Sequence, residues 1–150
     1  MKKSIEKFRI VLADDDLDDC EMFDLALREV NTNFTLEIFN DGKDLLNYLH
    51  TIESDLPHLV FLDLNMPFVN GFQTLTEIRR NEKTKDLSVA IYSTSSSEKD
   101  IEEALVSGAN IYITKPTSFS MLEQILKRVL EMNWQFQKNR FSKDTFYFRL

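Results

Sequence analysis

Four aspartates follow two apolar segments that have the composition of buried strands. Asp14, Asp15 and Asp16 follow "RIVLA", and Asp63 follows "HLVFL". Ligands of open α/β sheets bind beyond the carboxyl ends of the strands, so we expect these acids to meet at one edge. Carboxylates held close together repel one another, and they escape this repulsion by protonation or by binding a hard cation. Mg²⁺ suits such a site, because Asp15, Asp63 and a backbone carbonyl after Asp63 would supply three oxygen ligands.

Two further strand ends add groups that would hold an anion. Ser93 ends "SVAIYS", and Lys115 follows "NIYIT". The lysine offers a positive point charge to an anionic ligand, and the serine offers a hydroxyl donor. The ordered set predicts a site for an oxyanion beside a metal, and its specificity comes from the whole set rather than from any one member.

The remaining acids of "DDDLDD" have a simpler interpretation. Asp16, Asp18 and Asp19 are expected only to solvate the start of a helix, where the helix dipole favours negative charge. No reactive group follows the strand that ends near Phe39, so this strand is expected to lie away from the site.

Segments of strand and helix character alternate five times along the chain. Apolar or alternating patterns predict strands at 9–13, 34–39, 58–62, 88–93 and 110–114. Amphipathic patterns predict helices at 20–30, 42–52, 72–80, 98–109 and 118–134. A capping box of Ser95 and Glu98 is expected to start the fourth helix, and Gly108 to end it. This order predicts an α/β fold, a doubly wound five-stranded parallel sheet with helices on both faces.

The composition limits the class of protein. The chain has 150 residues, enough for one domain, and 43% of them are hydrophobic, enough for a core. Its net charge of −7 argues against a nucleic-acid surface. The single cysteine, Cys20, can form no internal disulfide and fits a reducing compartment. No apolar run near the start resembles a signal peptide or a membrane span, so a cytoplasmic domain without membrane contact is expected.

The end of the chain differs from the rest. One domain is expected over 1–134, followed by a tail at 135–150 that mixes charge with aromatic residues. Those aromatic residues are Phe136, Phe141, Phe146, Tyr147 and Phe148. The tail is interpreted either as a frayed terminus or as a segment that docks on its own domain or a partner, and docking is preferred because exposed aromatics would leave an apolar patch.

Four motifs taken together resemble one family. "VLADDD", "VFLDLNMPFVNGF", "AIYSTSS" and "GANIYITKP" are similar, in order and spacing, to the receiver domain of two-component response regulators. The similarity spans about Arg9 to Glu131 and implies a CheY-like, flavodoxin-like strand order of 2-1-3-4-5. The extended ends most resemble stand-alone regulators of the phytochrome-associated type.

The resemblance implies a role for each matching residue. Asp63 would be the phospho-acceptor, becoming a 4-aspartylphosphate. Asp14, Asp15, Asp63 and the Asn65 backbone carbonyl would hold Mg²⁺. Lys115 would contact the phosphoryl group, and Ser93 and Tyr112 would form the switch pair, with Tyr112 rotating inward after phosphorylation. The Lys115–Pro116 peptide bond would be cis. Ser93 and Leu17 depart from the commoner threonine and proline, and neither change removes a needed group.

The function implied is a signalling switch rather than an enzyme with an outside substrate. A histidine kinase or phosphotransfer protein would phosphorylate Asp63, and the face of segments 98–109, 110–114 and 118–134 would change shape for a protein target or a second copy. The tail is expected to share in that interface, and no nucleic acid or membrane is expected as a partner.

Three alternatives stay open from the residues. The first is a degenerate receiver that serves only as a scaffold. The second is a Mg²⁺-dependent phosphatase, which would need an acid two residues after its nucleophile, where this chain has Asn65. The third is a flavin-binding module, whose phosphate would be repelled by the acids after the first strand.

Overall fold

The computed structural model describes residues 7–31, 33–53, 55–132 and 147–148. Its strands are β1 (Phe8–Ala13), β2 (Phe34–Phe39), β3 (Leu59–Leu62), β4 (Val89–Ser93), β5 (Ile111–Thr114) and β6 (Tyr147–Phe148). Its helices are α1 (Leu17–Val30), α2 (Gly42–Thr51), α3 (Gly71–Arg80), α4 (Glu98–Ser107) and α5 (Phe119–Leu130). Helix therefore follows strand five times, as predicted.

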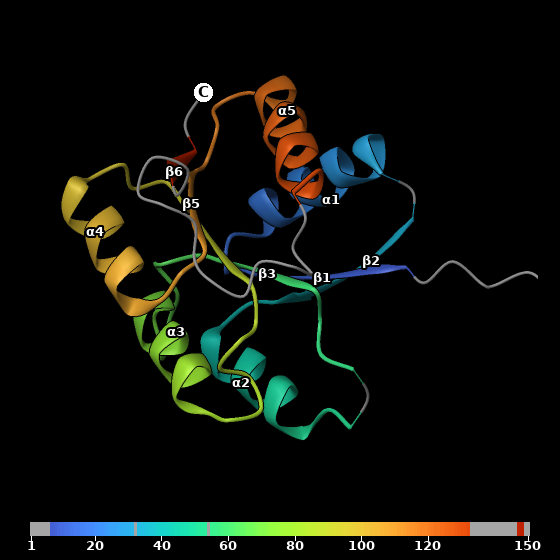
Figure 1. Ribbon diagram of the computed structural model, residues 1–150. Coiled ribbons are helices and arrows are strands. Elements are labelled where there is room, and N and C mark those ends of the chain that lie inside the picture. Colours follow the sequence, from blue (N-terminus) through green and yellow to red (C-terminus); the bar gives the residue numbers. More distant parts are fainter. Residues whose placement is uncertain (1–6, 32, 54, 133–146, 149–150) are drawn as a thin grey trace, which may run out of the picture.

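The strands form one parallel sheet in the order β2-β1-β3-β4-β5-β6. The expected order of the first five strands is confirmed, with α1 and α5 on one face and α2, α3 and α4 on the other (Figure 1). The order runs outward from β1 in both directions, so the ends of β1 and β3 lie together at the point where a ligand site is expected. No helix in the described part of the chain is long and apolar enough to span a membrane.

The sixth strand extends the sheet beyond the five that were predicted. Tyr147 and Phe148 pair with Tyr112 and Ile113 of β5. These two tail residues therefore lie against the chain's own domain. The predicted boundary near Trp134 and the tail aromatics Phe136, Phe141 and Phe146 lie outside the described residues.

Alternate residues of the central strands supply the two halves of the core. In β1, Ile10 and Leu12 pack under α1 and α5, whereas Val11 and Ala13 pack under α2 and α3. The strands β3, β4 and β5 alternate in the same way, because successive side chains of a strand point to opposite faces. Both faces are buried, which explains why these strands are continuous apolar runs.

The helix ends agree with local chemistry, with one correction. Gly108 ends α4 with φ of 103°, a left-handed conformation that glycine adopts without penalty. The expected capping box of Ser95 and Glu98 is wrong, because Ser97 is the N-cap and its side chain accepts a hydrogen bond from the Asp100 N–H. Ser95 instead donates its hydroxyl to the Asp100 carboxylate at 2.6 Å.

A close backbone contact positions the end of β3. The Gly71 N–H, at the start of α3, donates to the Leu64 carbonyl at 2.9 Å. A Cβ at position 71 would overlap the Asp63 carbonyl oxygen and lie 2.6 Å from Leu64 Cα. Only glycine lets α3 start this close to the strand end that carries Asp63.

We expect the Gly71→Ala substitution to lower the free energy of unfolding by about 1–3 kcal/mol, because the backbone around Asp63 must shift to admit the methyl group. Urea denaturation measures this change. Thr76→Ala, on the exposed side of the same helix, is the matched control and should change stability by less than about 0.5 kcal/mol. Equal effects of the two substitutions would contradict the close contact.

Candidate functional site

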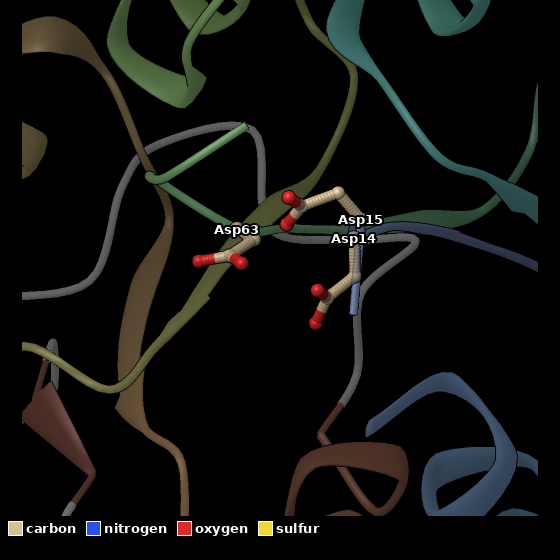
Figure 2. A group of neighbouring side chains, drawn as sticks. All are labelled: Asp14, Asp15 and Asp63. Atoms are coloured by element: carbon tan, nitrogen blue, oxygen red, sulfur yellow. The ribbon is translucent and has the colours of Figure 1, made fainter. Parts of the chain in front are cut away.

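Asp14, Asp15 and Asp63 meet at the carboxyl ends of β1 and β3. Their carboxylate oxygens lie within 4.8 Å of one another, and Figure 2 shows the three side chains gathered beside the strand ends. Asp14 is fully buried and Asp63 is 5% exposed, whereas Asp15 is exposed. The structure therefore brings Asp63 beside Asp14 and Asp15, which precede it by 49 and 48 positions, as the sequence predicted.

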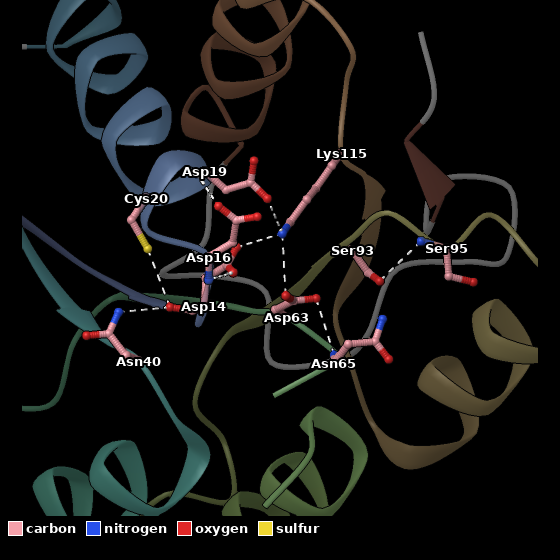
Figure 3. A network of polar contacts seen from close by, with 10 residues as sticks. All are labelled: Asp14, Asp16, Asp19, Cys20, Asn40, Asp63, Asn65, Ser93, Ser95 and Lys115. Atoms are coloured by element: carbon pink, nitrogen blue, oxygen red, sulfur yellow. Dashed lines mark hydrogen bonds and ion pairs between the residues drawn. The ribbon is translucent and has the colours of Figure 1, made fainter. Parts of the chain in front are cut away.

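Lys115 supplies the positive charge of this cluster. Its Nζ lies 2.7 Å from Asp14 Oδ2, 2.8 Å from Asp19 Oδ2 and 3.4 Å from Asp63 Oδ2 (Figure 3). Burial lowers the pKa of Lys115, but the contacts with Asp14 and Asp19 and the charge of Asp63 outweigh burial and raise the pKa above its ordinary value. Lys115 is therefore a fixed cation at the edge of the sheet.

The role expected for Asp19 is wrong. Asp19 contacts Lys115 instead of merely solvating the helix start. Asp16 acts as the N-cap of α1, since its side chain accepts from the Asp19 N–H at 3.1 Å, and Asp18 is exposed in the first turn. The 96 positions between Asp19 and Lys115 left no local signal of their contact.

Asp14 is held by groups whose contacts with it the sequence did not predict. Its Oδ1 accepts from the Asp16 N–H at 3.0 Å. Its backbone carbonyl accepts from Asn40 Nδ2 at 3.1 Å and from Cys20 Sγ at 3.4 Å (Figure 3). Burial, followed by the charge of Asp14, raises the pKa of Cys20 to about 11, so the thiol keeps the proton it donates. Asn40 directly follows β2, so this strand does contribute to the site, contrary to expectation.

Asp63 is strongly affected by its surroundings. Burial raises the pKa of Asp63 to about 6 from 3.8; Lys115 opposes this rise, and Asp14 adds to it. The Asn65 N–H donates weakly to Asp63 Oδ1 at 3.4 Å and also favours the charged form. Ionising Asp63 therefore costs free energy while Lys115 is the only cation nearby. A second cation bound beside Asp63 would lower that cost, so the site favours cation binding.

The residues present fit a hard divalent cation. Asp14 Oδ2 is buried and lies 2.7 Å from the Lys115 ammonium. A carboxylate oxygen paired with one cation keeps a second lone pair, which can accept from a metal-bound water. Three carboxylates within one ion's reach, all oxygen donors, match the preference of Mg²⁺.

Ser93 and Tyr112 lie on neighbouring strands and both contact Ser95. The buried Ser93 hydroxyl oxygen accepts from the Ser95 N–H at 3.3 Å, and the Tyr112 hydroxyl donates to the Ser95 carbonyl at 2.8 Å. The ring of Tyr112 is fully buried. The structure thus has Tyr112 already in the inward position, without the rotation that was expected to bring it there.

The expected cis bond between Lys115 and Pro116 is wrong, because the described residues contain no cis peptide bond. The trans isomer is the lower-energy form of most X-Pro bonds, and the family resemblance alone had suggested the other. The trans bond still leaves Lys115 directed at Asp14 and Asp63.

We expect Asp63→Asn to raise the free energy of unfolding by about 1–3 kcal/mol at about pH 7.5 without divalent cations. The folded pKa exceeds the ordinary value, so the ionised carboxylate destabilises the wild type above about pH 6. The wild type regains this stability as the pH falls from about 6 toward 4, and the difference between the proteins should shrink. Urea denaturation across this pH range measures it.

Asp18→Asn, which removes an exposed acid of α1, is the control for net charge. The Asp18→Asn substitution should change the free energy of unfolding little across the same pH range. An Asp63→Asn protein no more stable than this control would contradict the repulsion inferred at the site.

Comparison with known proteins agrees with this geometry. Residues 10–127 match the family described as the response regulator receiver domain. A curated relative, the probable methanogenesis regulatory protein FilR2 of Methanothrix harundinacea, is 31% identical over 84% of this chain and 83% of its own. Response regulator Rcp1 of Synechocystis is 27% identical over 80% of this chain and 84% of its own.

Two crystal structures of regulators share the fold. The phosphorylated cyanobacterial phytochrome response regulator RcpA has a TM-score of 0.78 and 30% identity, covering 91% of this chain and 99% of its own. The Mn²⁺-bound form of Rcp1 has a TM-score of 0.74 and 26% identity, covering 89% and 99%. The sheet order, the acidic edge and the matched residues agree, and the chain belongs to the receiver domain family of two-component response regulators.

Proposed function

We propose that Asp63 accepts a phosphoryl group from a histidine kinase or a phosphotransfer protein and that the modified domain signals to another protein. The observation that carries this proposal is the position of Asp63, almost buried between two other carboxylates and the cation of Lys115. Receiver domains act as signalling switches, and the matched relatives are regulators.

The transfer needs an ionised nucleophile approached in line by the phosphorus. A carboxylate oxygen of Asp63 forms the new P–O bond while the P–N bond of the donor phosphohistidine breaks. The electron pair of that bond stays on the imidazole nitrogen, which takes up a proton. Lys115, already 3.4 Å from Asp63, pairs with a phosphoryl oxygen of the product.

Asp14, Asp15, Asp63 and the Asn65 backbone carbonyl are the groups proposed to hold Mg²⁺. Bound there, the cation would offset the repulsion between the incoming phosphoryl oxygens and the carboxylates. The crystal structure of Rcp1 with Mn²⁺ supports this assignment by likeness. Asp14, which is fully buried and contacts Lys115, would act mainly through a bound water.

Ser93, Ser95 and Tyr112 are proposed to transmit the change. When the Ser93 hydroxyl turns to donate to a phosphoryl oxygen, it breaks its contact with the Ser95 N–H. The loop that carries Ser95 must adjust, and the same residue accepts the Tyr112 hydroxyl bond. Phosphorylation would therefore give Ser93 a new partner and move the Ser95 loop, to which the already inward Tyr112 is bonded.

The surface proposed for output is formed by α4, β5 and α5, and β6 belongs to it. Tyr112 is itself the residue of β5 that pairs with Tyr147. Any movement of Tyr112 would therefore reach the tail strand directly. This supports a role for the tail in contact with a protein target or a second copy. We propose the boundary between domain and tail near residue 134.

We expect intact-mass spectrometry to find one added phosphoryl group after incubation with acetyl phosphate and Mg²⁺. Asp63→Asn should abolish the addition, and so should removal of the metal with EDTA, whereas Asp18→Asn should leave it intact. Retained labelling in Asp63→Asn would place the acceptor elsewhere. An unlabelled wild type would favour the scaffold interpretation, and repeated turnover of a generic phosphate ester would favour the phosphatase.

We expect Asp15→Asn to weaken Mg²⁺ binding by at least about tenfold, since loss of even an outer-shell partner typically costs about 10–100-fold in metal affinity. Asp15 is exposed, so the fold should tolerate the change. Isothermal titration calorimetry measures the affinity, with Asp18→Asn as the matched control. An affinity equal to that of the control would remove Asp15 from the ligand set.

A further inference from the structure

Phe68 occupies a conformation that a residue with a side chain adopts only at a cost. Its φ is 66°, and it is the one non-glycine residue with positive φ in the described ranges. The Val69 N–H donates to the Pro67 carbonyl at 2.8 Å, two positions back. This bond and the positive φ define a γ-turn of the rare, strained kind centred on Phe68. Backbone strain of this kind gathers at functional sites.

The side chain of Phe68 buries little surface against the described part of the chain, so packing there does not offset the strain. It is 86% exposed, more than any other large hydrophobic side chain in the described part of the chain. Two local preferences, for relaxed backbone and for apolar burial, are thus violated at one residue. A residue that has both a strained backbone and an exposed apolar side chain, with no contact to offset either, is expected at a functional site.

The loop around Phe68 is nevertheless firmly anchored. Leu64 and Met66 are buried before it, and the Gly71 N–H bonds back to the Leu64 carbonyl. After it, Asn70 and Gln73 form a reciprocal capping box at the start of α3. The ring is therefore held out in solvent by a loop fixed at both ends, which reduces the entropy lost when a partner binds it.

The location of this ring points to a protein as the occupant. Phe68 is five residues after Asp63, on the loop that starts at this recessed acceptor. Leu17, 70% exposed, is the first residue of α1, two residues after Asp15, which follows the neighbouring strand β1. A macromolecular donor that brings a phosphorylated side chain to Asp63 must contact the surrounding rim, whereas a small donor can enter without it.

We propose that Phe68 is the apolar anchor by which the phosphoryl-donating protein docks beside Asp63, an inference that rests on the proposed function. The partner surface is a basic one with an apolar pocket next to its phosphohistidine, because Asp15, Asp16 and Asp18 are exposed near the site and the chain carries a net charge of −7. Exposed aromatics that insert into such pockets contribute a large share of binding energy.

The test compares a small donor with protein donors on the full chain. Phe68→Ala should take up phosphate from acetyl phosphate and Mg²⁺ at the wild-type rate. Transfer is then measured from each radiolabelled histidine kinase and phosphotransfer domain of the source organism, using the donor with the highest kcat/KM toward wild type. Phe68→Ala should raise KM by about tenfold with kcat unchanged, the effect of losing an interface anchor.

Three further variants separate docking from folding. Val106→Ala removes an apolar side chain of α4 that is 81% exposed, and it should leave transfer unchanged. Phe68→Leu keeps an apolar group and should retain most of the transfer. Phe68→Gly relieves the turn, so its urea midpoint should equal or exceed that of wild type. Phe68→Ala keeps the strained turn and removes only the ring, so a urea midpoint of this variant below that of wild type would show that the ring packs on its own domain and would overturn the proposal.

The remaining outcomes are also decisive. The proposal fails if no protein donor labels wild type, or if KM for Phe68→Ala stays within about twofold of wild type. It fails too if Phe68→Ala alters only the mass of the protein in solution, since the occupant would then be a second copy. Wild type that acetyl phosphate does not label at Asp63 would instead refute the proposed function, so the two failures are distinguishable.

Discussion

The ion contacts of Lys115 are the interaction on which the rest of the site depends. Three carboxylates at one end of a sheet would repel one another strongly, and the ammonium group lies within 3.4 Å of Asp14, Asp19 and Asp63. It offsets part of that repulsion and leaves the remainder, as the raised pKa of Asp63 indicates. An acidic site that is only partly neutralised is suited to a cation and then to a phosphoryl group.

The same contacts connect elements that lie far apart in the sequence. Asp19 belongs to α1, Asp63 follows β3 and Lys115 follows β5, so one side chain links elements at both sides of the central strands (Figure 3). A second set of bonds, centred on Ser95, extends from Ser93 to Tyr112 and to Asp100 of α4. The chemistry at the strand ends and the surface of α4 and β5 thus share a loop of a few residues.

The loops at the edge of the sheet combine close fit with strain. Gly71 is needed because α3 starts against the backbone of Asp63, and Phe68 lies in a strained turn a few residues earlier. The first feature positions the acceptor, and the second has no structural benefit within the described part of the domain. The two features lie on one loop, which is expected if that loop both positions Asp63 and presents a contact surface to a partner.

The sequence by itself determined the sheet, the helices and most of the site. Four apolar strands, the alternating strand at 34–39 and five amphipathic helices have strong periodic signals, and Asp14, Asp15, Asp63, Ser93 and Lys115 all stand at strand ends. Parallel strands bring their carboxyl ends to one edge, so position along the chain was enough to group these residues.

Only the tertiary structure decided the contacts that cross between elements. Asp19 looked like one more helix-start acid until Lys115, 96 positions away, was placed beside it. Asn40 and Cys20 reach the Asp14 carbonyl from β2 and α1, and β6 joins the sheet through backbone bonds that any two residues can make. The inward position of Tyr112 and the trans Lys115–Pro116 bond are likewise features of the folded chain that residue type alone does not determine.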